Sequence, residues 1–169
     1  METDAVYKAM LDARVLLDAH GEERSKATGE RCIAFKVAGE SYAVDLTSVK
    51  EVITPPDLLP VPGSEVEVLG VINLRGSILT VVNARSMLGL DGCAEGPLAR
   101  ILVLDEGGCQ VGALVDAVED IVSVDLDALD PAPARRSAEP PGSIRGACNI
   151  EGQIAFVLRA SALSGVRQS

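Results

Sequence analysis

The sequence predicts an all-β fold in which two similar units of about five strands each follow an N-terminal helix. Three observations carry this prediction. From Arg31 onward, apolar residues alternate with a period of two, which is typical of strands with one buried face. The pattern of residues 31–90 recurs over residues 98–163, which indicates an internal duplication. With 47% hydrophobic residues but only two Phe, two Tyr and no Trp, the chain is expected to have an aliphatic core.

The first thirty residues form a separate segment, in which residues 5–19 have the spacing of a helix. The apolar residues that recur on one face are Val6, Met10, Ala13 and Leu17. His20-Gly21 ends this helix, and the polar stretch 22–30 is expected to be a connector. We expect the helix to cover the domain or to lie in solvent, and a partner-binding role is the alternative.

The first unit contains five strand-like runs. They are residues 31–37, 41–46, 47–53, 69–74 and 77–82. Gly39-Glu40 separates the first two as a hairpin, and a proline-rich turn at 55–63 precedes the last two. Arg75-Gly76 lies between the last two runs, and an X-Gly pair there predicts a tight turn in which glycine takes a positive φ. Residues 84–88 are expected to close this half as one helical turn.

The second unit repeats the first in register. Residues 111–122 match 42–53 at an offset of 69, and residues 146–163 match 70–87 at an offset of 76. Six positions of the second match are identical: Gly70/Gly146, Asn73/Asn149, Gly76/Gly152, Ile78/Ile154, Val81/Val157 and Ala84/Ala160. The change of offset is expected to be absorbed by an irregular, proline-containing loop at 125–143.

The charge balance excludes several classes of partner. Fifteen Lys and Arg stand against 25 Asp and Glu, which gives a net charge of −10. Nucleic acid is not expected as a partner, because phosphate binding needs a basic face and base stacking needs aromatic rings. The charge-free stretches are far shorter than the ~18 residues of a membrane span, so direct membrane insertion is not expected. The acidic N-terminus lacks the apolar core of a signal peptide, which is typical of a cytoplasmic protein.

No constellation of catalytic or metal-ligating residues is evident. The single histidine, His20, is far in sequence from the four cysteines, and no two cysteines have CxxC spacing. Cys32, Cys109 and Cys148 lie in strand-like runs and are expected to be small buried hydrophobic residues. We therefore expect no metal, no cofactor and no catalytic residue, and a small enzyme is the least favoured alternative.

The two units differ at the exposed position of a repeated turn, where Arg75 of the first unit corresponds to Glu151 of the second. Because a tight-turn side chain points to solvent, neither charge is expected to be needed for packing. Arg75 is either a solvated turn residue or the anchor for a carboxylate on a partner. Two such units side by side are expected to leave a cleft, lined by Val49 and Val52, that suits an amphipathic helix.

Four motifs, in order along the chain, resemble those of the CheW-type coupling proteins of bacterial chemotaxis. The strongest is G-V-I-N-L-R-G at 70–76, which looks like that family's G-V-x-N-L-R-G signature. The others are Tyr42–Asp45 with Val49–Val52 (Y-x-I-D…V-x-E-I), Val61–Gly63 (the V-P turn) and Val111–Asp116 (V-G-x-x-V-D). The resemblance covers about residues 32–163. One departure is Thr80, which stands where proline is common in the family.

The resemblance implies two interlaced five-stranded SH3-like β barrels and an adaptor without catalytic activity. Such adaptors link the cytoplasmic tips of methyl-accepting chemoreceptors to the regulatory domain of the histidine kinase CheA, in arrays at the membrane. In the family, the groove between the barrels receives the receptor helix. By motif match, the receptor-binding candidates are Val49, Glu51, Val52 and Arg75. The candidate kinase contacts lie in the turn around 62–70 and are Pro62, Gly63, Leu69 and Gly70.

The expected organisation is therefore a helix and connector at 1–30, a CheW-like domain at 31–165 and a tail at 166–169. Within the domain, the subdomains divide near 31–90 and 98–163 and are intertwined. The alternative function is that of a CheW-like regulatory scaffold in a chemosensory-type pathway unrelated to motility. That scaffold would share the barrels with the family but would not bind its receptors.

Overall fold

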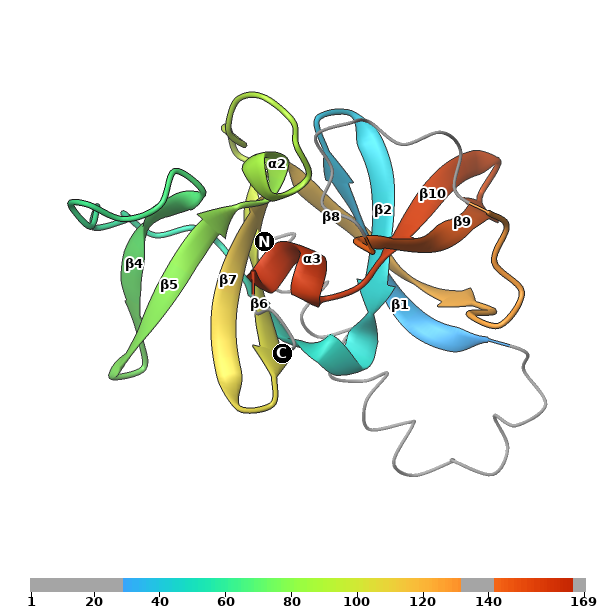
Figure 1. Ribbon diagram of the computed structural model, residues 1–169, viewed down its shortest axis with the longest axis horizontal. Coiled ribbons are helices and arrows are strands. Elements are labelled where there is room, and N and C mark those ends of the chain that lie inside the picture. Colours follow the sequence, from blue (N-terminus) through green and yellow to red (C-terminus); the bar gives the residue numbers. More distant parts are fainter. Residues whose placement is uncertain (1–28, 132–141, 166–169) are drawn as a thin grey trace.

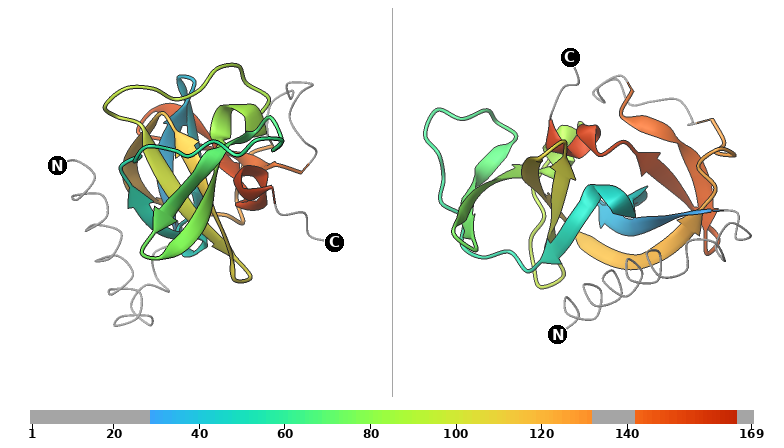
Figure 2. Two further views of the ribbon diagram at one scale, coloured as in Figure 1. Left: turned by 90° about the vertical axis from the view of Figure 1, so that its left-hand side faces the viewer. Right: turned by 90° about the horizontal axis from the view of Figure 1, so that it is seen from below.

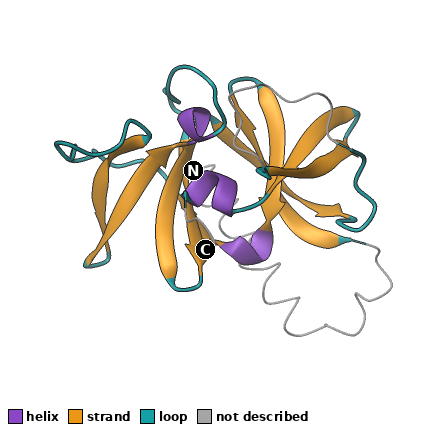
Figure 3. Ribbon diagram, viewed as in Figure 1, coloured by secondary structure: helices purple, strands orange, loops and turns teal. Residues whose placement is uncertain are grey.

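The computed structural model describes residues 29–131 and 142–165, and these residues form ten strands and three short helices (Figures 1 and 3). The strands are β1 (Glu30–Val37), β2 (Glu40–Asp45), β3 (Val49–Ile53), β4 (Val68–Leu74), β5 (Ser77–Asn83), β6 (Arg100–Glu106), β7 (Cys109–Val115), β8 (Ala117–Val124), β9 (Ile144–Ile150) and β10 (Gln153–Leu158). The helices are η2 (Leu46–Ser48), α2 (Ala84–Met87) and α3 (Ser161–Ser164). Within this described part of the chain, no helix is long and apolar enough to cross a membrane. The helix expected at 5–19 and the tail at 166–169 lie outside the described residues.

The strands form two five-stranded sheets, each with strands from both halves of the chain. Sheet A has the order β8-β1-β2-β10-β9, and sheet B has the order β3-β6-β7-β5-β4. Both are mixed, because β10 pairs with β2, and β5 with β7, in parallel, while the other pairs are antiparallel. The right-hand view of Figure 2 shows the two curled sheets side by side. The prediction of a mostly β fold with two five-stranded units is confirmed, and the units exchange strands.

The internal duplication predicted from the sequence holds at the level of strand register. Tyr42 pairs with Phe156 in sheet A, and Val111 pairs with Thr80 at the corresponding place in sheet B. These pairs are related by the same offsets of 69 and 76 that relate the two halves of the sequence. The outermost hairpins, β4–β5 and β9–β10, both contain a bulge at corresponding positions. Corresponding residues of the two sheets can therefore be compared directly.

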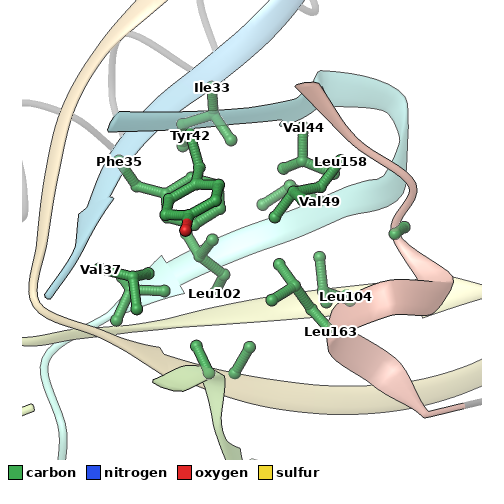
Figure 4. Close-up of a cluster of buried hydrophobic side chains, with 14 of the residues drawn as sticks. Ile33, Phe35, Val37, Tyr42, Val44, Val49, Leu102, Leu104, Leu158 and Leu163 are labelled. Carbon is green, nitrogen blue, oxygen red and sulfur yellow. The ribbon is translucent and has the colours of Figure 1, made fainter. Parts of the chain in front are cut away.

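A central cluster of buried aliphatic residues lies between the two sheets (Figure 4). Val44 from sheet A and Val49 and Leu104 from sheet B all have 0% exposure in this cluster. Tyr42 stacks against Phe35 with ring centroids 6.0 Å apart, and it also contacts Phe156 at 5.9 Å. Each sheet also has a smaller cluster of its own, formed on its other face. The aliphatic core expected from the composition is thus divided into three layers.

The cysteines show how the two outer clusters differ. Cys32 is buried in the outer cluster of sheet A, as expected, whereas Cys148 is only half-buried and packs against that cluster; they correspond to Ile101 and Ile72 in the outer cluster of sheet B. Burial raises the pKa of the Cys32 thiol to about 12, so this thiol stays protonated at neutral pH. The expectation that Cys109 is buried is wrong, because it begins β7 beside a hairpin turn and is exposed.

All four hairpins in the described residues have two-residue turns in which both residues take a positive φ. The turns are Ala38-Gly39, Arg75-Gly76, Gly107-Gly108 and Glu151-Gly152. This geometry matches the right-handed twist of the flanking strands. In two of the hairpins an asparagine stabilises the turn, because Asn73 Oδ1 accepts a hydrogen bond from Gly76 N and Asn149 Oδ1 accepts one from Gly152 N, each at 2.9 Å.

A matched pair of substitutions tests the central core. Val44→Asp, at 0% exposure, is expected to unfold the domain, because it places an unpaired charge among aliphatic side chains at a cost of more than about 4 kcal/mol. Val66→Asp makes the same chemical change at a position that is 85% exposed, and it is expected to alter stability by less than about 0.5 kcal/mol. Circular dichroism during urea unfolding measures both. Two variants of equal stability would contradict the layered core.

Candidate functional site

The repeated turn of sheet B carries an ion pair that joins the two edges of the sheet. Arg75 Nη1 donates a hydrogen bond to Glu51 Oε2 at 2.6 Å. Glu51 lies on β3 and Arg75 in the β4–β5 turn, and β3 and β4 are the two outermost strands of sheet B. The side chains differ strongly in exposure, at 67% for Arg75 and 4% for Glu51. The pair thus presents a cation at the surface and keeps its counter-charge inside.

A bulge in β3 explains why Glu51 is buried. The register between β3 and β6 shifts between Val49 and Glu51, so that Lys50 is an extra residue and is exposed. After the shift, Glu51 pairs with Val103, which belongs to the outer cluster of sheet B. Glu51 Oε1 is buried and accepts no hydrogen bond within the described part of the chain. The carboxylate is therefore a costly group for the fold to bury, and Arg75 is what offsets that cost.

Val49 and Val52, the other two predicted receptor-binding residues, belong to the core. Their exposures are 0% and 3%, and both lie in the central cluster, where Figure 4 labels Val49 beside Leu158. Their side chains are enclosed, so they do not line an open cleft. Of the four receptor-binding candidates, the structure brings Glu51 and Arg75 into contact and leaves Arg75 as the exposed one.

Among residues 29–131 and 142–165, sheet A carries no equivalent of this ion pair. The position that corresponds to Glu51 is Asp120 on β8, and the position that corresponds to Arg75 is Glu151. Both acidic residues are exposed, and Asp120 Oδ1 accepts a hydrogen bond from the adjacent Ile121 N at 2.7 Å. The duplicated fold therefore forms with a solvated carboxylate at the place where sheet B buries one.

The predicted kinase-binding residues divide into exposed and supporting positions. Pro62 and Gly63 are exposed in the β3–β4 loop, Leu69 is half-buried and Gly70 is buried. A Cβ on Gly70 would lie 2.6 Å from the carbonyl oxygen of Leu59, which forms an isolated bridge with Val71. Gly70 is thus required by the close approach of the loop to β4. The same loop exposes three large apolar side chains: Leu59 at 68%, Val61 at 40% and Val66 at 85%.

A second ion pair, which the sequence analysis did not anticipate, joins α2 to the end of β7. The Arg85 guanidinium donates hydrogen bonds to both carboxylate oxygens of Asp116, with Nε 3.2 Å from Oδ1 and Nη2 2.5 Å from Oδ2. The hydrogen bonds that Arg85 donates to Asp116 raise the pKa of Arg85 above its usual value. Asp116 N also donates to Lys36 O at 3.0 Å, which connects sheet B to β1 of sheet A. Asp116 ends the V-G-x-x-V-D motif, so a signal for its importance was present, but its partner was not evident.

The expectation that the Arg75 charge is not needed for packing is wrong, because Arg75 neutralises a buried carboxylate. Arg75→Glu is therefore expected to lower the free energy of unfolding by roughly 1–3 kcal/mol, since it leaves Glu51 buried beside a second negative charge. Glu151→Gln at the corresponding turn of sheet A is expected to stay within about 0.5 kcal/mol of the wild type. Thermal or urea unfolding distinguishes the two. Equal effects would mean that the Glu51–Arg75 pair does not stabilise the fold.

Comparison with known proteins supports this description of the fold. A solved structure of the scaffolding protein TtCheW from Thermoanaerobacter tengcongensis superimposes with a TM-score of 0.69 at 23% identity, covering 77% of this chain and 88% of that one. Chemotaxis protein CheW of Rhizobium meliloti is 34% identical over 126 residues, which are 75% of this chain and 81% of that protein. Chemotaxis protein CheW of Bacillus subtilis is 31% identical over 136 residues, or 80% and 87% of the two chains. The family model for the CheW-like domain matches residues 31–167, so the chain belongs to the CheW-like family.

Proposed function

We propose that this chain is an adaptor that couples the signalling tips of chemoreceptors to a CheA-type histidine kinase in bacterial chemosensory signalling. As a member of the CheW-like family, it is a non-enzymatic scaffold. The observation that carries the proposal is the exposed Arg75, held against Glu51 in the turn of the G-V-x-N-L-R-G motif. We place the protein in the cytoplasm, at membrane-bound receptor arrays.

On the receptor side, Arg75 is the candidate contact, and Val49, Glu51 and Val52 are the residues that hold it in place. The chain has a net charge of −10, so a cation that is 67% exposed on a tight turn is a distinctive feature of this surface. A guanidinium binds carboxylates with strong, directional hydrogen bonds. We therefore expect the receptor helix to present an acidic side chain to Arg75.

On the kinase side, the β3–β4 loop is the candidate contact surface. Pro62 and Gly63 lie between exposed apolar residues of this loop, and large apolar side chains at a surface favour contact with another protein. Leu69 and Gly70 begin the strand against which the loop is anchored. They are expected to act by shaping the loop, and a receptor bound at Arg75 would leave the loop residues to the kinase.

Co-purification tests the proposal as a whole. The full chain, a CheA-type kinase from the same bacterium and a chemoreceptor cytoplasmic fragment are mixed, and the complex is isolated by size-exclusion chromatography. The proposed coupling role requires one complex that contains all three proteins. Binding to neither protein, with each shown to be folded, would contradict it.

The receptor contact is tested by removing the charge of Arg75. Arg75→Gln is expected to weaken binding to the receptor fragment by about tenfold or more, because it deletes a charge-assisted hydrogen bond, while kinase binding is retained. Glu151→Gln alters the corresponding turn of sheet A and serves as the matched control, with no expected loss. Isothermal titration calorimetry measures both affinities. If Arg75→Gln binds the receptor fragment like the wild type, the receptor does not contact this turn.

The kinase contact is tested at an exposed apolar position of the loop. Val66→Asp is expected to weaken binding to the kinase regulatory domain by about tenfold, since it places a charge in an apolar interface without disturbing the core. Receptor binding is expected to be unchanged. Biolayer interferometry with immobilised kinase domain gives the affinity, and unaltered kinase binding would move the contact to another face.

A further inference from the structure

A binding partner can reach only one member of the Glu51–Arg75 pair, because Arg75 is exposed and Glu51 is enclosed. Arg75 is 67% exposed, whereas the Glu51 side chain is 4% exposed and its Oε1 is fully covered. A docking protein can reach the guanidinium without any change of conformation. The carboxylate is out of its reach as long as the fold keeps this arrangement.

The internal duplication shows that the ion pair is not needed to shape the turn. Arg75 and Gly76 have φ values of 53° and 86°, and Glu151 and Gly152, where the described part of the chain forms no such pair, have values of 51° and 83°. In both turns the glycine N donates the same hydrogen bond to an asparagine Oδ1, at the same distance of 2.9 Å. Because the backbone is the same with and without the pair, the pair must act on something other than the backbone.

What the pair does determine is the direction of the Arg75 side chain. A long arginine side chain on an exposed turn samples many rotamers, and ordering it on binding costs entropy. Glu51 removes part of that cost in advance, because its Oε2 holds Nη1 at 2.6 Å from the opposite edge of the sheet. The carboxylate itself is held by burial in β3, opposite Val103 of β6.

We infer that Glu51 is a positioning residue, which orients Arg75 for a carboxylate of the docking partner and makes no contact of its own with that partner. This inference rests on the proposed function, since it assigns Arg75 to the docking surface. It separates two residues, from two different motifs, that the family resemblance would place together at the interface. It also means that the binding energy lost on removal of Glu51 is part of the contribution of Arg75.

A double-mutant cycle tests the inference, with a chemoreceptor cytoplasmic fragment as the probe. The variants are Arg75→Gln, Glu51→Leu and the double variant, and leucine is chosen because it replaces a buried carboxylate by an apolar side chain and leaves behind a cation that is exposed to solvent. Glu51→Leu is expected to weaken binding a few-fold, Arg75→Gln by about tenfold or more, and the double variant by no more than Arg75→Gln alone. If the fold-loss in affinity of the double variant equals the product of the two single losses, Glu51 has an independent contact with the partner, and the inference is wrong.

Nuclear magnetic resonance of the free chain tests the same inference without a partner. Restricted rotation of the guanidinium gives separate Nη signals for Arg75 in the wild type, and these signals are expected to merge in Glu51→Leu. Glu51→Gln, which keeps an acceptor oxygen, is expected to show intermediate exchange and provides a second variant if the leucine variant does not fold. Merged signals in the folded wild type would overturn the positioning role. A cycle in which Arg75→Gln has no effect, with separate signals in the wild type, would instead contradict the proposed receptor contact and leave the positioning of Arg75 standing.

Discussion

Burial of aliphatic side chains between the two sheets is the interaction on which the rest of the structure depends. Neither sheet has enough aromatic residues to form a large core, because the whole chain contains only four. The central cluster instead contains side chains from both sheets, and the rings of Phe35 and Phe156 both contact Tyr42 there. Val49 and Val52 contribute to this cluster from β3, the same strand that carries Glu51. The core therefore holds β3 in place, and Glu51 on β3 in turn holds the side chain of Arg75 at the surface.

The two halves of the chain differ in charge at the positions of the ion pair. The turn backbone, the supporting asparagine and the bulges are all retained, while Glu51 and Arg75 correspond to Asp120 and Glu151. A pair of opposite charges allows one acid to be buried, and a pair of like charges requires both to stay in solvent. One sheet consequently presents a cation at its turn and the other an anion. This difference gives a nearly symmetric fold two distinguishable ends.

Much of the fold could be predicted from the sequence, but the orientation of individual side chains at the site could not. Alternating apolar residues indicated the strands, and the repeated Asn and Gly positions indicated the turns, because both signals are local. The β3 bulge broke this reasoning: strict alternation places Val49 and Glu51 on the same face of the strand, but the extra residue Lys50 puts Glu51 on the face opposite Val49. Two charged residues between Val49 and Val52 are typical of exposed positions, and only the pairing with β6 reveals that Glu51 is enclosed. The contact with Arg75, 24 positions away, likewise depends on the curl of the whole sheet.

The exchange of strands between the sheets has a consequence for how the protein is made. β2 receives its parallel partner β10 from a segment 114 residues later, counted from Tyr42 to Phe156. At a translation rate of about 5–20 residues per second, the edge of β2 stays open for roughly 6–23 s while the rest of the chain emerges from the ribosome. An open strand edge beside an unfinished apolar core is prone to pair with other chains. Newly synthesised protein thus passes through a period in which it depends on protection, and a chain that stops before β10 would leave that edge permanently unpaired.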